Sequence, residues 1–141
     1  MARVQRTFVM LKPDAIKMRL VGRILARIEG EGMGIVALKV VKLERKIAEA
    51  LYEVHRGKPF FRSLIDYITS GPVIVAVVEG PDAVRTVRKA CGATDPSKAG
   101  VGTIRGDFGT SVTKNAIHAA DSIDSAEREI ALFFKPDEVV S

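Results

Sequence analysis

The chain has 141 residues, 47% of them hydrophobic, and a formal net charge of +5. This length is typical of one compact domain, here expected over residues 1–141, whose core needs no disulfide staples. The sequence contains neither an apolar run of about 18 residues, as a membrane span would require, nor an N-terminal signal peptide pattern. The basic balance suits nucleotides, nucleic acids or acidic membranes and does not choose among them.

The first third of the chain predicts two strands around a helix. Residues 7–11 form a nearly continuous apolar run, which is typical of a buried central strand. Pro13 ends this strand, because proline cannot donate to a ladder and suits the first turn of a helix. Apolar residues at helical spacing predict a helix over 22–28, which the following glycines end, and residues 35–43 predict a second strand.

The remaining chain predicts a helical pair, two further strands and two further helices. Helices are expected over 48–55, 60–68, 82–88 and 122–133, strands over 73–78 and 115–120, and a long irregular segment over 92–113. A loop of that length in a compact domain is usually functional or disordered. The order β-α-β-(α-α)-β-α-loop-β-α fits an α+β sandwich of the ferredoxin-like kind. We expect a mostly antiparallel four-stranded sheet with helices on one face.

The chain has two histidines, His55 and His118, as candidates for a reactive ring. His55 ends a helix before a Gly-Lys-Pro stop, which favours a structural or peripheral role. His118 lies among small residues on a short strand, and helical spacing places Glu129 beside the buried stripe of the last helix. A buried carboxylate needs a partner, and an imidazole N–H would fit, leaving the other ring nitrogen free to attack. A core histidine beside a surface glutamate explains the same residues equally well.

Two further features have alternative interpretations. Residues 102–108 place glycines around Arg105, so that backbone N–H groups and a guanidinium could hold phosphate; a plain surface loop is the alternative. The spacing is neither that of a Walker A loop nor that of the dinucleotide fingerprint. Cys91 is the single cysteine and cannot form an internal disulfide, which favours a reducing, intracellular setting and a packed thiol.

The segment 115–122 resembles the active-site signature of the nucleoside diphosphate kinases, N-x-x-H-x-S-D. Further blocks similar to that family follow one another along essentially the whole chain. They cover residues 7–14, 55–61, 70–73, 102–108 and 125–130. Several spaced blocks in the family's order make the resemblance highly specific.

The resemblance implies a phosphotransferase that moves the γ-phosphate of a nucleoside triphosphate to a nucleoside diphosphate. In the family the reaction is ping-pong, through a phosphohistidine on Nδ1 of the residue matching His118, and a glutamate matching Glu129 bonds the imidazole. Tyr52 matches a residue that supports the lysine and the histidine. The implied catalytic residues are thus His118, Lys12, Tyr52 and Glu129.

The resemblance also implies how the nucleotide is held. The ring matching Phe60 stacks on the base, with Val112 opposite, and stacking tolerates any base. Lys12 and Asn115 match residues that bond the ribose hydroxyls, and Lys12 also lies near the transferred phosphoryl group. The implied nucleotide-binding residues are Lys12, Phe60, Arg88, Thr94, Arg105, Val112 and Asn115, of which Arg88, Thr94 and Arg105 match phosphate-binding positions.

We expect Mg²⁺ to arrive with the nucleotide phosphates, because no carboxylate cluster in the sequence would form a dedicated metal cage. The expected partners are nucleoside tri- and diphosphates and further copies of the chain, a homohexamer rather than a tetramer. No membrane or nucleic acid is required, and the expected location is the cytoplasm.

The chain departs from the family at two places. Ala120 replaces the serine that commonly supports the glutamate, and the sequence ends at Ser141 without the longer extension of some relatives. Three other interpretations compete with a phosphotransferase. They are a non-enzymatic regulatory or nucleic-acid-binding module, a relative that binds nucleotides without transfer, and a carrier phosphorylated by another protein.

Overall fold

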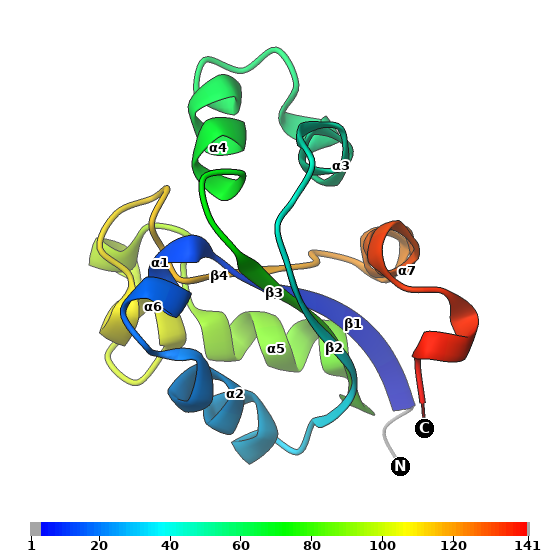
Figure 1. Ribbon diagram of the computed structural model, residues 1–141. Coiled ribbons are helices and arrows are strands. Elements are labelled where there is room, and N and C mark those ends of the chain that lie inside the picture. The colour runs from blue at the N-terminus through cyan, green and yellow to red at the C-terminus, as the bar shows by residue number, and fades with distance from the viewer. Residues whose placement is uncertain (1–3, 141) are drawn as a thin grey trace.

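The sheet is antiparallel throughout, with its four strands in the order β2-β3-β1-β4 (Figure 1). The computed structural model describes residues 4–140, so predictions that concern residues 1–3 and 141 lie outside the described residues. The strands are β1 (Val4–Leu11), β2 (Gly34–Val41), β3 (Val73–Pro81) and β4 (Ile117–Ala119). This order, with helices packed on the sheet, confirms the expected ferredoxin-like α+β class.

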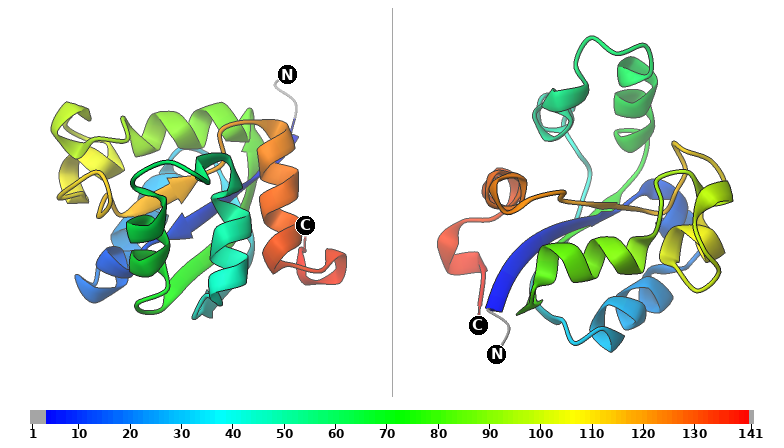
Figure 2. Two further views of the ribbon diagram at one scale, coloured as in Figure 1. Left: turned by 90° about the horizontal axis from the view of Figure 1, so that it is seen from above. Right: turned by 180° about the vertical axis from the view of Figure 1, so that it is seen from behind.

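Both faces of the sheet are covered. Successive side chains of a strand point to opposite faces, and in β1 Phe8 and Met10 pack into one apolar cluster while Val9 and Leu11 pack into the other. All four side chains are fully buried, as in a central strand with layers above and below it. The expectation of helices on one face alone was therefore wrong (Figure 2).

The helices divide between the two faces. The first face carries α3 (Arg45–Leu51), α4 (Phe61–Ile68) and α7 (Ile123–Phe133), and the second carries α2 (Val21–Gly30) and α5 (Ala83–Cys91). In Figure 1, α3 and α4 stand above the sheet and form a projecting hairpin, while α2 and α5 lie below it. Among residues 4–140, no helix combines the length and apolar character that crossing a lipid bilayer demands.

Short helical turns occupy several connections. The turn α1 (Pro13–Lys17) follows β1 directly, and the helix expected over 48–55 ends at Leu51 and continues as the 3₁₀ turn η1 (Glu53–His55). The segment 92–113 is not wholly irregular, since it contains η2 (Pro96–Lys98) and α6 (Ile104–Phe108). A last 3₁₀ turn, η3 (Pro136–Glu138), follows α7.

Candidate active site

The pairing of β1 with β4 brings together residues that are far apart in the sequence. His118 lies opposite Met10 in the ladder, and Lys12 follows the last residue of β1. The backbone N–H of Lys12 donates to the carbonyl of Ala116 at 2.9 Å, which extends the contact between the two segments. The lysine and the histidine therefore emerge at the same end of the strand pair.

His118 forms a short hydrogen bond with a carboxylate from α7. Its Nε2 lies 2.7 Å from Oε1 of Glu129, and the two side chains are 15% and 5% exposed. A carboxylate accepts a hydrogen bond from Nε2–H, and in that tautomer the lone pair of the ring is on Nδ1. Within residues 4–140, Nδ1 has no hydrogen-bond partner. The interpretation of Glu129 as a surface glutamate beside a core histidine is wrong, since Glu129 is buried against the ring.

A cleft of about 560 Å³ opens in front of His118. Every residue that the resemblance implied for the site lines it except Glu129, which lies behind the histidine ring. These lining residues are Lys12, Tyr52, Phe60, Arg88, Thr94, Arg105, Val112, Asn115 and His118.

The inner wall of the cleft is cationic. Arg105 is 6% exposed, and its Nε and Nη2 donate to the carbonyl of Ile117 while Nη1 donates to that of Gly92. Lys12 is buried as well, and its Nζ donates to the carbonyl of Thr113 at 3.3 Å. Burial, together with the nearby charge of Arg105, lowers the pKa of Lys12 to about 8.

Arg105 is fixed by the turn that carries it. Thr103 caps α6: its hydroxyl accepts the N–H of Gly106 at 3.1 Å and donates to the carbonyl of Gly100. Arg27 from α2 forms an ion pair of 2.6 Å with Asp107 and donates to two carbonyls at the start of the turn. The interpretation of this segment as a plain surface loop is therefore wrong, because it holds a buried guanidinium in the cleft wall.

Two buried polar groups in the cleft lack a partner among the described residues. They are the hydroxyl of Tyr52 and the carboxamide oxygen of Asn115, whose Nδ2 donates to the carbonyl of Thr94 at 3.0 Å. Burial and the charge of Glu129 raise the pKa of Tyr52 above its usual range, so its hydroxyl remains a donor. Buried polar groups without a partner are rare in folded proteins, and these two belong to residues that line the cleft, where water or a ligand can satisfy them.

The mouth of the cleft is apolar and exposed. Phe60 is 46% and Val112 is 55% exposed, although both are large hydrophobic residues. The ring of His55 lies 5.2 Å from that of Phe60 at an interplanar angle of 62°. His55 also lines the cleft, which the prediction of a structural or peripheral role did not anticipate.

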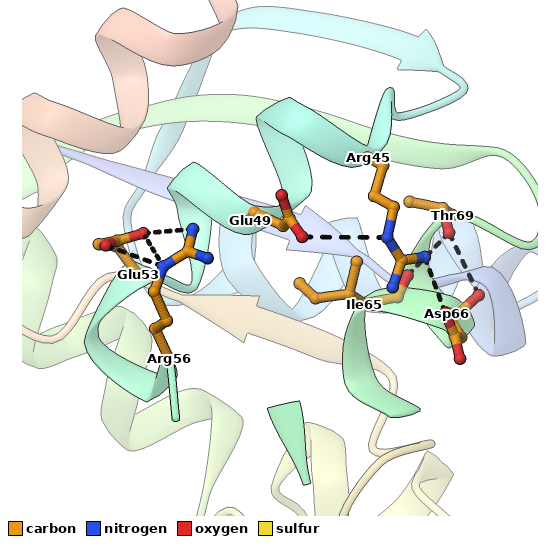
Figure 3. Close-up of polar contacts among 7 residues, drawn as sticks. All are labelled: Arg45, Glu49, Glu53, Arg56, Ile65, Asp66 and Thr69. Atoms are coloured by element: carbon orange, nitrogen blue, oxygen red, sulfur yellow. Dashed lines mark hydrogen bonds and ion pairs between the residues drawn. The ribbon is translucent and has the colours of Figure 1, made fainter. Parts of the chain in front are cut away.

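Phe60 lies at the tip of the α3–α4 hairpin, between η1 and α4. Arg45 on α3 forms an ion pair of 2.7 Å with Asp66 on α4, which joins the two helices, and a longer one of 3.9 Å with Glu49 on α3 itself (Figure 3). Exposed pairs of this kind contribute only about 0.2–1 kcal/mol each. The hairpin is held mainly by its apolar face, which includes Leu64 and Ile65.

The sequence of the whole chain matches one protein family. The family model for nucleoside diphosphate kinase matches residues 5–139, nearly the whole chain.

The chain belongs to the nucleoside diphosphate kinase family.

Proteins named nucleoside diphosphate kinase from two archaea are close in sequence. The protein of Ignicoccus hospitalis is 55% identical over 137 residues, which cover 97% of this chain and 93% of that protein. The protein of Archaeoglobus fulgidus is 54% identical over 138 residues, covering 98% and 91%. The chain is accordingly an enzyme of the nucleotide phosphate-transferring class.

Solved structures of the family superpose on this fold. The nucleoside diphosphate kinase of Halobacterium salinarum in complex with CDP gives a TM-score of 0.95 at 47% identity, covering 99% of this chain and 93% of that one. The Aquifex aeolicus nucleoside diphosphate kinase gives 0.94 at 44% identity, covering 98% and 100%.

Against the pattern of the nucleoside diphosphate kinases, Ala120 remains the unusual position. It is fully buried, and its backbone N–H donates to the carbonyl of Phe8 at 3.1 Å. The second oxygen of Glu129 faces Arg128, with Nη2 at 3.6 Å from Oε2. The carboxylate thus has a cationic neighbour on the side away from the histidine.

Some residues at the site were not predicted from sequence. Leu64 and Asp121 line the cleft, and Asp14 lies buried behind it. Asp14 and Asp121 each fall within a block that resembles the family, which was the available signal. Cys91, in contrast, is the packed thiol that was expected, and burial raises its pKa to about 11.

Proposed function

We propose that the chain transfers the γ-phosphate of a nucleoside triphosphate to a nucleoside diphosphate by a ping-pong mechanism through phosphorylated His118. The observation that carries the proposal is the 2.7 Å bond between Nε2 of His118 and Glu129, which leaves Nδ1 as the nucleophile toward the cleft. An imidazole oriented by a carboxylate is an activated nucleophile.

The order of groups along the cleft supports one orientation of the nucleotide. The base stacks between Phe60 and Val112 at the exposed mouth. The ribose hydroxyls meet Lys12 and the unpartnered oxygen of Asn115, deeper in the cleft. The phosphates then lie toward His118.

The cationic wall serves the phosphates. Arg88 and Arg105 bind phosphoryl oxygens with their guanidinium groups, together with the hydroxyl of Thr94. Stacking contributes about 1–3 kcal/mol per base and does not depend on which base is present. The proposal therefore includes broad base tolerance, with sugar and phosphates carrying recognition.

The transfer step follows from this placement. Nδ1 of His118 attacks the γ-phosphorus, the bond to the bridging β-oxygen breaks, and the nucleoside diphosphate leaves. A second nucleoside diphosphate then attacks the phosphorus of phosphohistidine and carries the group away. Lys12, Arg88 and Arg105 offset the charge that develops on the oxygens.

Magnesium belongs to the substrate in this proposal. Among residues 4–140, no group of His, Cys, Asp or Glu side chains is arranged to hold a metal ion by itself. One carboxylate, Asp121, lines the cleft, which fits an ion carried mainly by phosphate oxygens. Bound there, Mg²⁺ would neutralise charge on the β- and γ-phosphates.

The test is phosphorylation by γ-labelled ATP. We expect label that stays on the chain in alkali, is lost in acid, and passes to GTP when GDP is added. His118→Ala should abolish labelling, because it removes the nucleophile. His55→Ala is the matched control, since it removes the other histidine and should still give a labelled protein.

Three results would contradict the proposal: no labelled wild-type protein, label retained by His118→Ala, or label that GDP cannot remove. A carrier phosphorylated by another protein would give the first result. Chasing the label with CDP, UDP and dTDP tests base tolerance, and we expect rates within about tenfold of one another because stacking is insensitive to the base.

The proposal extends to assembly and location. We propose a homohexamer that works in the cytoplasm, in line with the reducing setting that a single cysteine favours. Light scattering checks assembly: the particle should have six times the 15.3 kDa mass of the chain. A particle of four chains would contradict the hexamer and leave the chemistry unaffected.

A further inference from the structure

A buried carboxylate behind the cleft contacts the segment that carries the site. Asp14 is 8% exposed, and with Tyr67 it lines a separate hollow rather than the nucleotide cleft. Its Oδ2 accepts the backbone N–H of Ala116 at 3.0 Å. Its Oδ1 accepts the hydroxyl of Tyr67 at 2.6 Å, and its own N–H donates to that hydroxyl at 2.7 Å. Both carboxylate oxygens are therefore bonded within the protein.

Ala116 has a backbone conformation that alanine rarely adopts. Its φ is +77°, in the left-handed region where a Cβ is disfavoured. Neither glycine nor asparagine occupies the position, so the surrounding structure must hold it. Both polar backbone groups of Ala116 are bonded to one segment, its N–H to Asp14 and its carbonyl to the N–H of Lys12.

The turn at Ala116 lies between two residues of the candidate site. Ala116 separates Asn115, which lines the cleft, from β4, which carries His118. A change in φ at Ala116 would rotate Asn115 relative to His118, since the two lie on opposite sides of it. If the backbone hydrogen bonds of Ala116 to Asp14 and Lys12 were broken, solvent water could not replace them, because Ala116 is fully buried.

We propose that Asp14, supported by Tyr67, is a positioning residue that holds the left-handed turn at Ala116 and so aligns Asn115 and His118 for phosphate transfer. Asp14 does not touch the substrate in this role. The inference rests on the proposed function, because its measure is the rate at which His118 is phosphorylated.

The first test compares Asp14→Ala with Asp14→Asn. The alanine variant removes the acceptor of the Ala116 N–H, and we expect phosphohistidine to form about ten- to a hundredfold more slowly at saturating ATP. The asparagine variant keeps a neutral acceptor, so it should lose less, about three- to tenfold. Equal rates for the wild type and Asp14→Ala would overturn the inference.

The second test separates positioning from a general loss of packing. Ala116→Gly removes the Cβ that makes the left-handed conformation unfavourable. The slowing caused by Asp14→Ala should therefore be smaller in the Ala116→Gly background than in the wild type. If Asp14→Ala slowed the reaction only by loosening α1, the Ala116→Gly background would not reduce the slowing. An equal slowing in both backgrounds would therefore contradict the positioning role of Asp14.

These measurements distinguish a failure of the proposed function from a failure of the inference about Asp14. If the wild type takes no label on His118, the proposed function fails, whatever the variants do. If the wild type is labelled and the two substitutions act independently, only the inference about Asp14 fails. Thermal unfolding identifies an unfolded variant. Should Asp14→Ala not fold, Tyr67→Phe replaces it in the same cycle, with slowing expected in the same sense and again smaller in the Ala116→Gly background.

Discussion

Lys12 is a buried cation whose charge depends on pH near neutrality. Burial and Arg105 lower its pKa to about 8, while the charge of Asp14 opposes that change. The ammonium form is the one that attracts phosphate, and it is lost as pH rises through that value. We therefore expect kcat/KM, which reports the free enzyme, to fall as pH increases above about 8.

The variants Lys12→Gln and Lys46→Gln test this assignment. Lys12→Gln should lower kcat/KM about hundredfold and remove the alkaline decline, because the titrating group is gone. Lys46 is exposed on α3, so its substitution should leave the decline in place. An alkaline decline that survives in Lys12→Gln would mean that another group titrates there.

At the scale of elements, α6 depends on glycine at position 106. A Cβ built there would overlap the backbone carbonyl oxygen of Gly100 and come within 2.7 Å of the hydroxyl of Thr103. Gly106→Ala should therefore lower the free energy of unfolding by about 1–3 kcal/mol. It should also reduce kcat/KM, since Arg105 is the neighbouring residue.

Gly100→Ala is the matched control in the same turn. A Cβ at Gly100 would meet no atom within 4 Å, and the residue does not have a positive φ. Urea denaturation and steady-state kinetics should show it to be close to the wild type. If both alanine variants behave alike, the overlap at Gly106 is relieved by movement of the turn and does not determine its shape.

The sequence predicted the long elements of the fold but not the short helix α6. The long elements were predictable because their apolar periodicity is strong, as in the run from Thr7 to Leu11. That run already indicated a strand covered on both faces, which the expectation of helices on one face overlooked. The helix α6 could not be predicted, because it has five residues, includes a glycine, and depends on a cap and on contacts from Arg27.

The sequence predicted some contacts of the candidate site and missed others. Helical spacing and the need of a buried carboxylate for a partner allowed a bond between His118 and Glu129 but explained a surface glutamate equally well; the family resemblance decided between them, and the structure has the bond. The contact between Asp14 and Ala116 could not be predicted, because it depends on a positive φ that an alanine does not signal. The placement of His55 in the cleft likewise depends on where α3 ends.

On the scale of the whole molecule, the nucleotide would join two parts of the fold. Phe60 is on the projecting α3–α4 hairpin, while Lys12 and Arg105 belong to the body around the sheet (Figure 1). Binding of ADP with Mg²⁺ should therefore slow amide exchange in residues 53–61. Helix α2, on the far face, serves as the internal control: it should gain only the protection that global stabilisation by the ligand gives, and so less than residues 53–61. Equal protection of α2 would indicate global stabilisation, and no protection of the hairpin would contradict the proposed position of the base.

The unpartnered hydroxyl of Tyr52 and oxygen of Asn115 affect how stable the protein is with and without a bound nucleotide. A buried polar group without a partner lowers the free energy of unfolding by about 1–3 kcal/mol, and a bound nucleotide that satisfies it restores that stability. The protein would then resist unfolding and proteolysis best where nucleotides are plentiful.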